Sequence, residues 1–146
     1  PPLDRVNAML SFLYTIFTRE YAAALESVGL DSYMGFYHSL RPGRESLACD
    51  LVEEGRCIVE RFVLTLINLK IIKPEDFDVQ VSGAVFLNDD GRKKVLSKWQ
   101  EKKRTDMIHP YLKEKIPMGL LPYVQSMLLA KFVRGEIDEY PCYLAK

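Results

Sequence analysis

The sequence is poor in the residues that most often mark a chemical site. Its 146 residues include two histidines and three cysteines, and the cysteines form no C-x-x-C pair. An odd number of scattered cysteines argues against a disulfide framework and a zinc finger, and fits free thiols in a reducing cytoplasm better. The formal net charge is zero, so bulk charge gives no reason to expect nucleic acid. No apolar run reaches the ~18 residues of a membrane span, which predicts no membrane contact.

The chain does contain a clear pattern of amphipathic helices. Apolar residues recur every three or four positions over 4–29 and 44–70, which predicts two long helices. The second is apolar nearly all round beyond its first turns, so we expect it to be central and buried. Alternating apolar residues over 79–87 predict a short β-hairpin and no other β structure. Two shorter helices are expected over 89–104 and 120–134. The chain is therefore predicted to be one mainly α domain, residues 1–146.

One stretch, GFYHSLRPGRESLACDLVEE (35–54), carries a set of potential metal ligands. Asp50 and Glu53 are three residues apart, so they project from one face of the predicted helix. His38 lies in the loop before that helix. One imidazole with two carboxylates suits Mn²⁺ or Mg²⁺ better than zinc. Acidic residues near a helix start are also common as a solvated face that interacts with the helix dipole, and the spacing leaves both interpretations open.

Two groups of basic residues are candidates for DNA contacts. Arg41 and Arg44 flank the turn before the predicted helix, where a helix N-terminus favours phosphate. The stretch GRKKVLSKWQEKKR (91–104) carries seven cations against one glutamate, and Lys93 and Lys94 are its candidate phosphate contacts. In both groups the alternative is a solvated surface without a ligand.

Three motifs with their spacing resemble one known family. They are NAMLSFLY (7–14), GLDSYMGFYH (29–38) and SLACDLVEEGR (46–56), followed by GAVFLNDDGRKKVL, MIHPYL and RGEIDEYPCYL. Together they resemble the C-terminal helical catalytic domain of the CRISPR-associated integrase and endonuclease ("Cas-one") family, which inserts new spacers into CRISPR arrays. The resemblance covers essentially the whole chain.

The resemblance implies a role for each candidate ligand. The metal-binding histidine of the family falls on His38 and an acidic ligand falls on Glu53, while Asp50 matches a further acidic position beside the site. The metal would be Mn²⁺ or Mg²⁺, and the reaction would be transesterification of DNA. The family completes its site with a glutamate upstream of the stretch that begins at Pro1. We therefore expect the 146 residues alone to be inactive and the full-length parent to be active.

The resemblance also implies partners. They are double-stranded DNA, as protospacer and CRISPR array, and a small ferredoxin-like second adaptation subunit that binds a homodimer of the parent. Two alternatives remain: a non-enzymatic helical module for assembly or DNA docking, and a helical domain of a longer fusion protein. The second histidine, His109, is followed by proline and is expected to be a loop residue outside the site.

Overall fold

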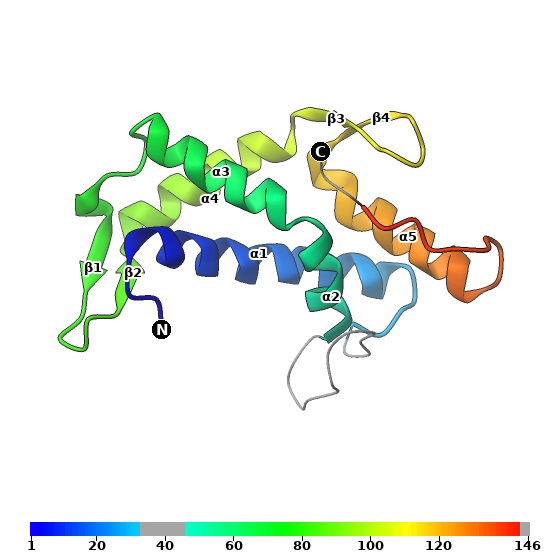
Figure 1. The fold of residues 1–146 in the computed structure, drawn as a ribbon, viewed down its shortest axis with the longest axis horizontal. Helices are drawn as coiled ribbons and strands as arrows, with labels where there is room; N and C mark the ends of the chain where they lie inside the picture. The colour runs from blue at the N-terminus through cyan, green and yellow to red at the C-terminus, as the bar shows by residue number, and fades with distance from the viewer. Residues whose placement is uncertain (33–45, 144–146) are drawn as a thin grey trace.

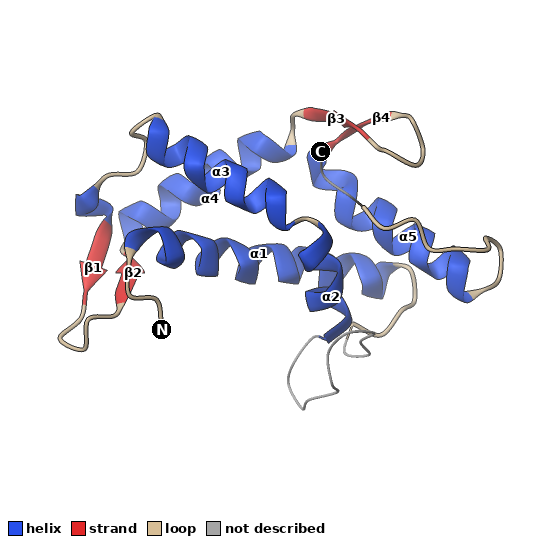
Figure 2. Ribbon diagram, viewed as in Figure 1, coloured by secondary structure: helices blue, strands red, loops and turns tan. Residues whose placement is uncertain are grey.

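The computed structural model describes residues 1–32 and 46–143. Within these residues the chain forms five α-helices, two 3-10 turns and two separate two-stranded sheets. Figures 1 and 2 show that helices make up most of the molecule, with the small sheets at its edges. The predicted mainly α fold is confirmed.

The first helix, α1 (Arg5–Ser27), is the central element of the fold. It begins at Asp4, whose side chain accepts a hydrogen bond from the backbone amide of Asn7 at 2.8 Å. It ends before Gly29, whose φ of +84° favours glycine. One stripe of α1 is almost fully buried and forms the middle of the core: Met9, Leu13, Phe17, Tyr21 and Leu25. The predicted first long helix is confirmed.

The second long helix is divided in two, which corrects the prediction of one helix over 44–70. Helix α2 (Ser46–Glu54) ends at Gly55, and α3 (Arg56–Asn68) begins after it. A Cβ at Gly55 would lie 2.8 Å from the ring of Phe17 on α1. The glycine therefore lets the joint press against α1, and the chain changes direction there (Figure 1).

Helix α3 is not buried all round, which corrects a second expectation. Leu64 is 53% exposed and Leu69 is 66% exposed. The inner side of α3 packs towards α1 and towards α4 (Asp89–Lys103), where the Phe62 ring meets Trp99 at 5.2 Å between centroids. Helix α4 begins at Asn88, whose side chain accepts from the Gly91 amide at 2.9 Å, as its sequence predicts.

The hairpin expected over 79–87 is present. After a 3-10 turn, η1 (Pro74–Asp76), strand β1 (Phe77–Val79) pairs antiparallel with β2 (Val85–Leu87), so that Phe77 faces Leu87. The predicted hairpin is therefore confirmed, and it begins two residues earlier than expected.

A second hairpin was not expected. Strand β3 (Asp106–Ile108) pairs with β4 (Lys115–Pro117), and the amide of His109 donates to the Glu114 carbonyl at 2.9 Å to close the turn. Each strand has three residues, too few to show a period of two, so the sequence indicated only an irregular connection here. His109 does lie in the loop between them, as predicted.

The last helix, α5 (Leu121–Val133), follows the 3-10 turn η2 (Met118–Leu120) and packs on α1. Gly135, with a φ of +75°, follows the helix end as predicted. The tail then runs back beside α5 towards the joint between α2 and α3 (Figure 1). None of the described helices is both long and apolar enough to cross a bilayer.

Candidate active site

The two carboxylates predicted as ligands lie one turn apart on α2, in different environments. Asp50 is buried, with 2% of its surface exposed, whereas the Glu53 side chain is 52% exposed. Glu53 Oε2 lies 2.7 Å from Nη2 of Arg56, which begins α3. Exposed ion pairs of this kind contribute at most about 1 kcal/mol, so the carboxylate of Glu53 can exchange Arg56 for another cation.

The structure leaves the remaining predicted ligand undescribed. Three of the predicted site residues lie outside the described ranges: His38, Arg41 and Arg44. The described residues on either side of this stretch are held together, because the Ser32 carbonyl accepts from the amide of Leu47 at 2.8 Å. Ser32 therefore lies beside the start of α2, about one turn before Asp50. Within residues 1–32 and 46–143, no three His, Cys, Asp or Glu side chains gather as a metal site.

The third carboxylate of α2, Glu54, points inward and is surrounded by donors. Its Oε1 accepts from the backbone amide of Tyr143 at 2.7 Å and lies 2.8 Å from the Tyr140 hydroxyl, whose distance to Oε2 is 3.0 Å. The Gln125 amide lies 3.4 Å from Oε1. Burial raises the pKa of Glu54, although these three hydrogen bonds act to lower it. The same burial, with the nearby Glu54 charge, raises the pKa of Tyr140 far above its usual range.

Gln125 connects Glu54 to His109. Both Gln125 and His109 are almost completely buried. The imidazole Nδ1 accepts from the amides of Tyr111 and Leu112, each at 3.2 Å, so the ring proton is on Nε2. Nε2 then donates to Gln125 Oε1 at 2.6 Å, and the Gln125 amide donates to the Tyr140 hydroxyl at 2.8 Å.

The sequence pattern does not predict this network. It involves three elements far apart in the chain: the end of α2, the β3–β4 turn and α5, together with the tail. The available signal was Gln125 itself, a polar residue in the apolar run LPYVQSMLLAKFV. A buried amide in such a helix needs hydrogen-bond partners. The side-chain partners of Gln125 are Glu54, His109 and Tyr140, which lie 15 or more residues away in the sequence.

The basic stretch on α4 is less free than its sequence suggested. Four of its seven cations pair with carboxylates. Three of these pairs are Lys94 with Asp76 at 3.0 Å, Lys98 with Glu101 at 3.3 Å, and Lys103 with Glu20 at 3.4 Å. Arg92 pairs with Asp89 as well. In the part of the chain that the structure describes, no ion pair involves the other three: Lys93, Lys102 and Arg104.

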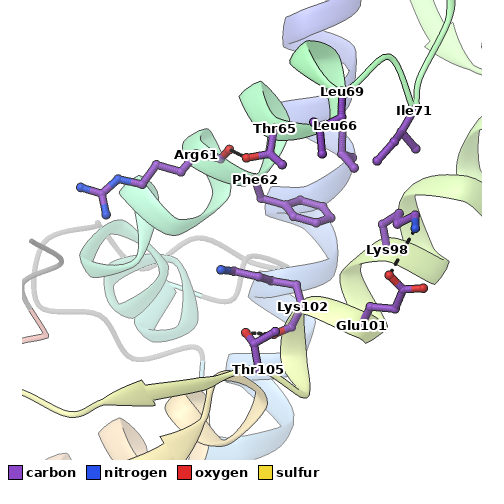
Figure 3. A pocket seen from close by; sticks show the side chains of 10 residues that line it. All are labelled: Arg61, Phe62, Thr65, Leu66, Leu69, Ile71, Lys98, Glu101, Lys102 and Thr105. Atoms are coloured by element: carbon purple, nitrogen blue, oxygen red, sulfur yellow. Dashed lines mark hydrogen bonds and ion pairs between the residues drawn. The ribbon is translucent and has the colours of Figure 1, made fainter.

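A groove of about 320 Å³ separates α3 from α4 (Figure 3). Its apolar lining comes mainly from α3 and the residues after it: Phe62, Leu66, Leu69 and Ile71. Arg61 and Lys102 extend towards the same side of the groove, one from each helix, whereas Lys98 is turned to Glu101. A second hollow of about 160 Å³ shares Arg61, Lys102 and Thr105 and continues to Tyr143. Two cations thus lie beside an apolar groove on the surface.

Comparison with known proteins gives the family of the fold. Residues 1–101 match the family described as CRISPR associated protein Cas1. The chain is 51% identical to a CRISPR-associated endonuclease Cas1 of Rhodospirillum rubrum, over all of this chain and 43% of that protein. Among solved structures, a casposase bound to integration product superposes with a TM-score of 0.87 at 25% identity, over 94% of this chain and 38% of that one. A partial Cas6-RT-Cas1–Cas2 complex gives 0.78 at 25% identity, over all of this chain and 43% of that one.

The chain thus spans less than half the length of the relative and of the two structures compared here. The match nevertheless includes α2, the stretch before it and the basic helix α4, which are the elements that carry the predicted ligands and DNA contacts. The mainly α fold, the motif spacing and the similarity along the whole chain agree, and the chain belongs to the Cas1 family.

Proposed function

We propose that this chain is the helical, metal-binding part of a Cas1 integrase, which joins new spacers to CRISPR arrays in an adaptation reaction that depends on a divalent metal. The observation that carries the proposal is the placement of Glu53: an accessible carboxylate one turn after a buried aspartate, on the helix that follows the His38 stretch. The names of the relatives support a nuclease, because the Rhodospirillum rubrum protein is called an endonuclease.

The donor set fits a hard divalent cation. Glu53 offers a half-exposed carboxylate, and an imidazole at His38 would add one nitrogen, a combination suited to Mn²⁺ or Mg²⁺. Asp50 is buried one turn earlier and would act beside the site, as an alternate ligand or as an acceptor that orients a ligand. These ligands are few for a cation that prefers six, so the 146 residues alone are expected to bind Mn²⁺ weakly.

In this mechanism the side chains of the protein hold the metal and orient the DNA, and the DNA supplies the reacting atoms. The oxygen of a DNA 3′-hydroxyl bonds to a phosphorus of the array, the bond from that phosphorus to the existing strand's 3′ oxygen breaks, and the hydroxyl proton ends on the leaving oxygen or in solvent. The metal, when bound, polarises the phosphoryl group and stabilises its developing charge. Glu53 holds Arg56 through Oε2 alone, so Oε1 would be open to a metal, and the exposed ion pair is weak enough to exchange as well.

DNA contacts outside the metal site would come from cations that no carboxylate holds. Lys93 is exposed and has this property among the described residues, whereas Lys94 contacts both oxygens of the buried Asp76 at 3.0 and 3.1 Å. We therefore assign the larger DNA contribution to Lys93. Arg41 and Arg44 remain proposed contacts beside the start of α2.

The full-length parent is proposed to act as a homodimer with the small ferredoxin-like adaptation subunit and with double-stranded DNA. One solved structure that contains a similar chain is a complex with Cas2, which supports a partner of this kind. That complex joins Cas6, RT and Cas1, so a fusion parent is compatible with this fold. The three cysteines are free thiols, which suits the reducing cytoplasm.

The test is strand transfer of a labelled duplex into a supercoiled plasmid by the full-length parent, with Mn²⁺ or Mg²⁺. We expect His38→Ala and Glu53→Ala to abolish joining and Asp50→Ala to reduce it less. The matched control is Glu60→Ala, which removes another exposed carboxylate from the neighbouring helix. Circular dichroism checks that each variant is folded.

A folded Glu53→Ala parent that joins DNA at the wild-type rate rejects the proposed site. If the wild-type parent binds DNA but joins none with either metal, the non-enzymatic docking module becomes the better description. Equal losses in Glu53→Ala and Glu60→Ala would show that general surface charge, and not a metal ligand, controls the reaction.

A further inference from the structure

A partly buried hydrogen-bond network holds the last residue of α2. We call it the Glu54 network, and its side chains are Glu54, Gln125, Tyr140 and His109. It joins α2 to α5, to the β3–β4 turn and to the tail, across 86 residues of sequence between Glu54 and Tyr140. Gln125 is 0% exposed and His109 is 1% exposed, so water does not compete for their hydrogen bonds.

The Glu54 carboxylate is occupied by this network and is not offered to a ligand. The Tyr143 amide and the Tyr140 hydroxyl donate to it at 2.7 and 2.8 Å, and Gln125 approaches at 3.4 Å. A half-buried carboxylate with these donors is firmly held, since each lost donor would leave part of its charge without a partner. The adjacent Glu53, by contrast, has its side chain 52% exposed.

Glu54 is followed directly by Gly55, the joint between α2 and α3. Gly55 has no side chain to restrict the backbone between α2 and α3. Its amide donates to the Val52 carbonyl at 2.9 Å, its carbonyl accepts from the Ile58 amide at 3.0 Å, and the Phe17 ring occupies the space that a side chain would need. At the other end of α2, the Leu47 amide is bonded to the Ser32 carbonyl. Leu51 and Val52 hold the last turn of α2 by burial in the core, and the hydrogen bonds to Glu54 hold it directly beside Glu53. The direction of this turn therefore depends in part on how firmly Glu54 is held.

We propose that Tyr140, Gln125 and His109 are positioning residues for the metal site: acting through Glu54, they fix the last turn of α2 and thereby aim the carboxylate of Glu53. The inference rests on the proposed function, because it assumes that Glu53 is a metal ligand. Groups that orient a ligand from behind typically change metal affinity by about 10–100-fold when removed.

The sharpest perturbation is Tyr140→Phe in the full-length parent. It keeps the ring and every formal charge, and removes only the hydroxyl that joins Gln125 to both oxygens of Glu54. The matched control is Tyr123→Phe, which removes a hydroxyl from a side chain that is 48% exposed on α5. A second variant, His109→Gln, alters the far end of the network without touching α2.

Two measurements separate positioning from simple stability. The first is the dissociation constant of Mn²⁺, followed by electron paramagnetic resonance of the free ion well below the unfolding temperature of each variant. The second is strand transfer as a function of Mn²⁺ concentration, with the KM for DNA measured at saturating metal. For Tyr140→Phe we expect the dissociation constant to rise about 10-fold. We also expect the rate to recover at high Mn²⁺ and the KM for DNA to stay unchanged.

A purely structural role predicts a lower unfolding temperature with unchanged Mn²⁺ affinity in the folded protein. The proposal is overturned if folded Tyr140→Phe and Tyr123→Phe bind Mn²⁺ equally well. If Tyr140→Phe does not fold, the same comparison between His109→Gln and Tyr123→Phe decides, with a weaker affinity expected for His109→Gln. Wild-type strand transfer and Mn²⁺ affinity in Glu53→Ala would overturn the proposed site itself, an outcome distinct from failure of the positioning role.

Discussion

The contact between Trp99 and Glu20 gives a quantitative test of the core. The indole Nε1 donates to Glu20 Oε1 at 2.7 Å, while Lys103 lies 3.4 Å from Oε2. The indole also packs edge-on against Phe17 and Phe62, with centroids 5.4 and 5.2 Å away. Trp99→Phe removes a hydrogen bond to a charged group, about 1.5–3 kcal/mol. It also removes two buried ring carbons, about 1.6 kcal/mol at ~0.8 each. We expect the free energy of unfolding to fall by about 3–5 kcal/mol.

A double-mutant cycle isolates the hydrogen bond. Glu20→Ala should cost less in the Trp99→Phe background than in the wild type, because the indole donor has already gone. We expect a coupling of about 1.5 kcal/mol from urea unfolding followed by circular dichroism. The control cycle pairs Trp99→Phe with Glu26→Ala, a carboxylate on the same helix that bonds Ser32 instead. A Trp99–Glu20 coupling no larger than the control's, within about 0.5 kcal/mol, refutes the reasoning.

Two further predictions concern the packing of α4 on the turn η1. Gly91→Ala would place a methyl group 2.4 Å from the Asp76 carbonyl, so we expect a loss of about 1–3 kcal/mol in urea unfolding; an unchanged midpoint would contradict the close packing. Burial acts to raise the pKa of Asp76, but the Lys73 amide and the Lys94 ammonium outweigh it and lower the pKa. A lowered folded pKa means that this stabilisation is present above about pH 4 and is lost as pH falls through the folded value. Asp76→Asn should therefore be less stable than the wild type at pH 7, with the difference shrinking by pH 3; a constant difference would refute this.

The sequence predicted the elements whose signals are local. Helix α1 follows from apolar residues at helical spacing, with Asp4 at its start and Gly29 after its end. Helix α4 follows in the same way from the Asn88 cap. The hairpin of β1 and β2 follows from alternation on either side of Gly83, whose φ is +90°. In each case the residues that determine the element lie within it or directly beside it.

The break at Gly55 and the second hairpin depend on distant contacts. A single glycine within an apolar helical run is tolerated in many helices, and here the ring of Phe17 on α1 occupies the space that a side chain would need. The strands β3 and β4 have three residues each; His109 follows β3, and Pro117 is the last residue of β4. The turn between them is anchored by the buried His109, whose contact with Gln125 on α5 the local pattern does not report.

The candidate site shows the same division more sharply, because α2 carries two adjacent glutamates with opposite surroundings. Successive residues on a helix are about 100° apart, so Glu53 and Glu54 necessarily face different ways. The sequence gives both the same chemistry; only the tertiary fold buries one among hydrogen-bond donors and leaves the other exposed beside Arg56. A metal ligand such as Glu53 needs an exposed carboxylate that can exchange Arg56 for the metal. A structural residue such as Glu54 needs hydrogen-bond donors around its carboxylate. The saturation of Glu54 with hydrogen-bond donors thus favours Glu53 as the ligand independently of the family motif, and it gives two adjacent carboxylates of one nine-residue helix different roles.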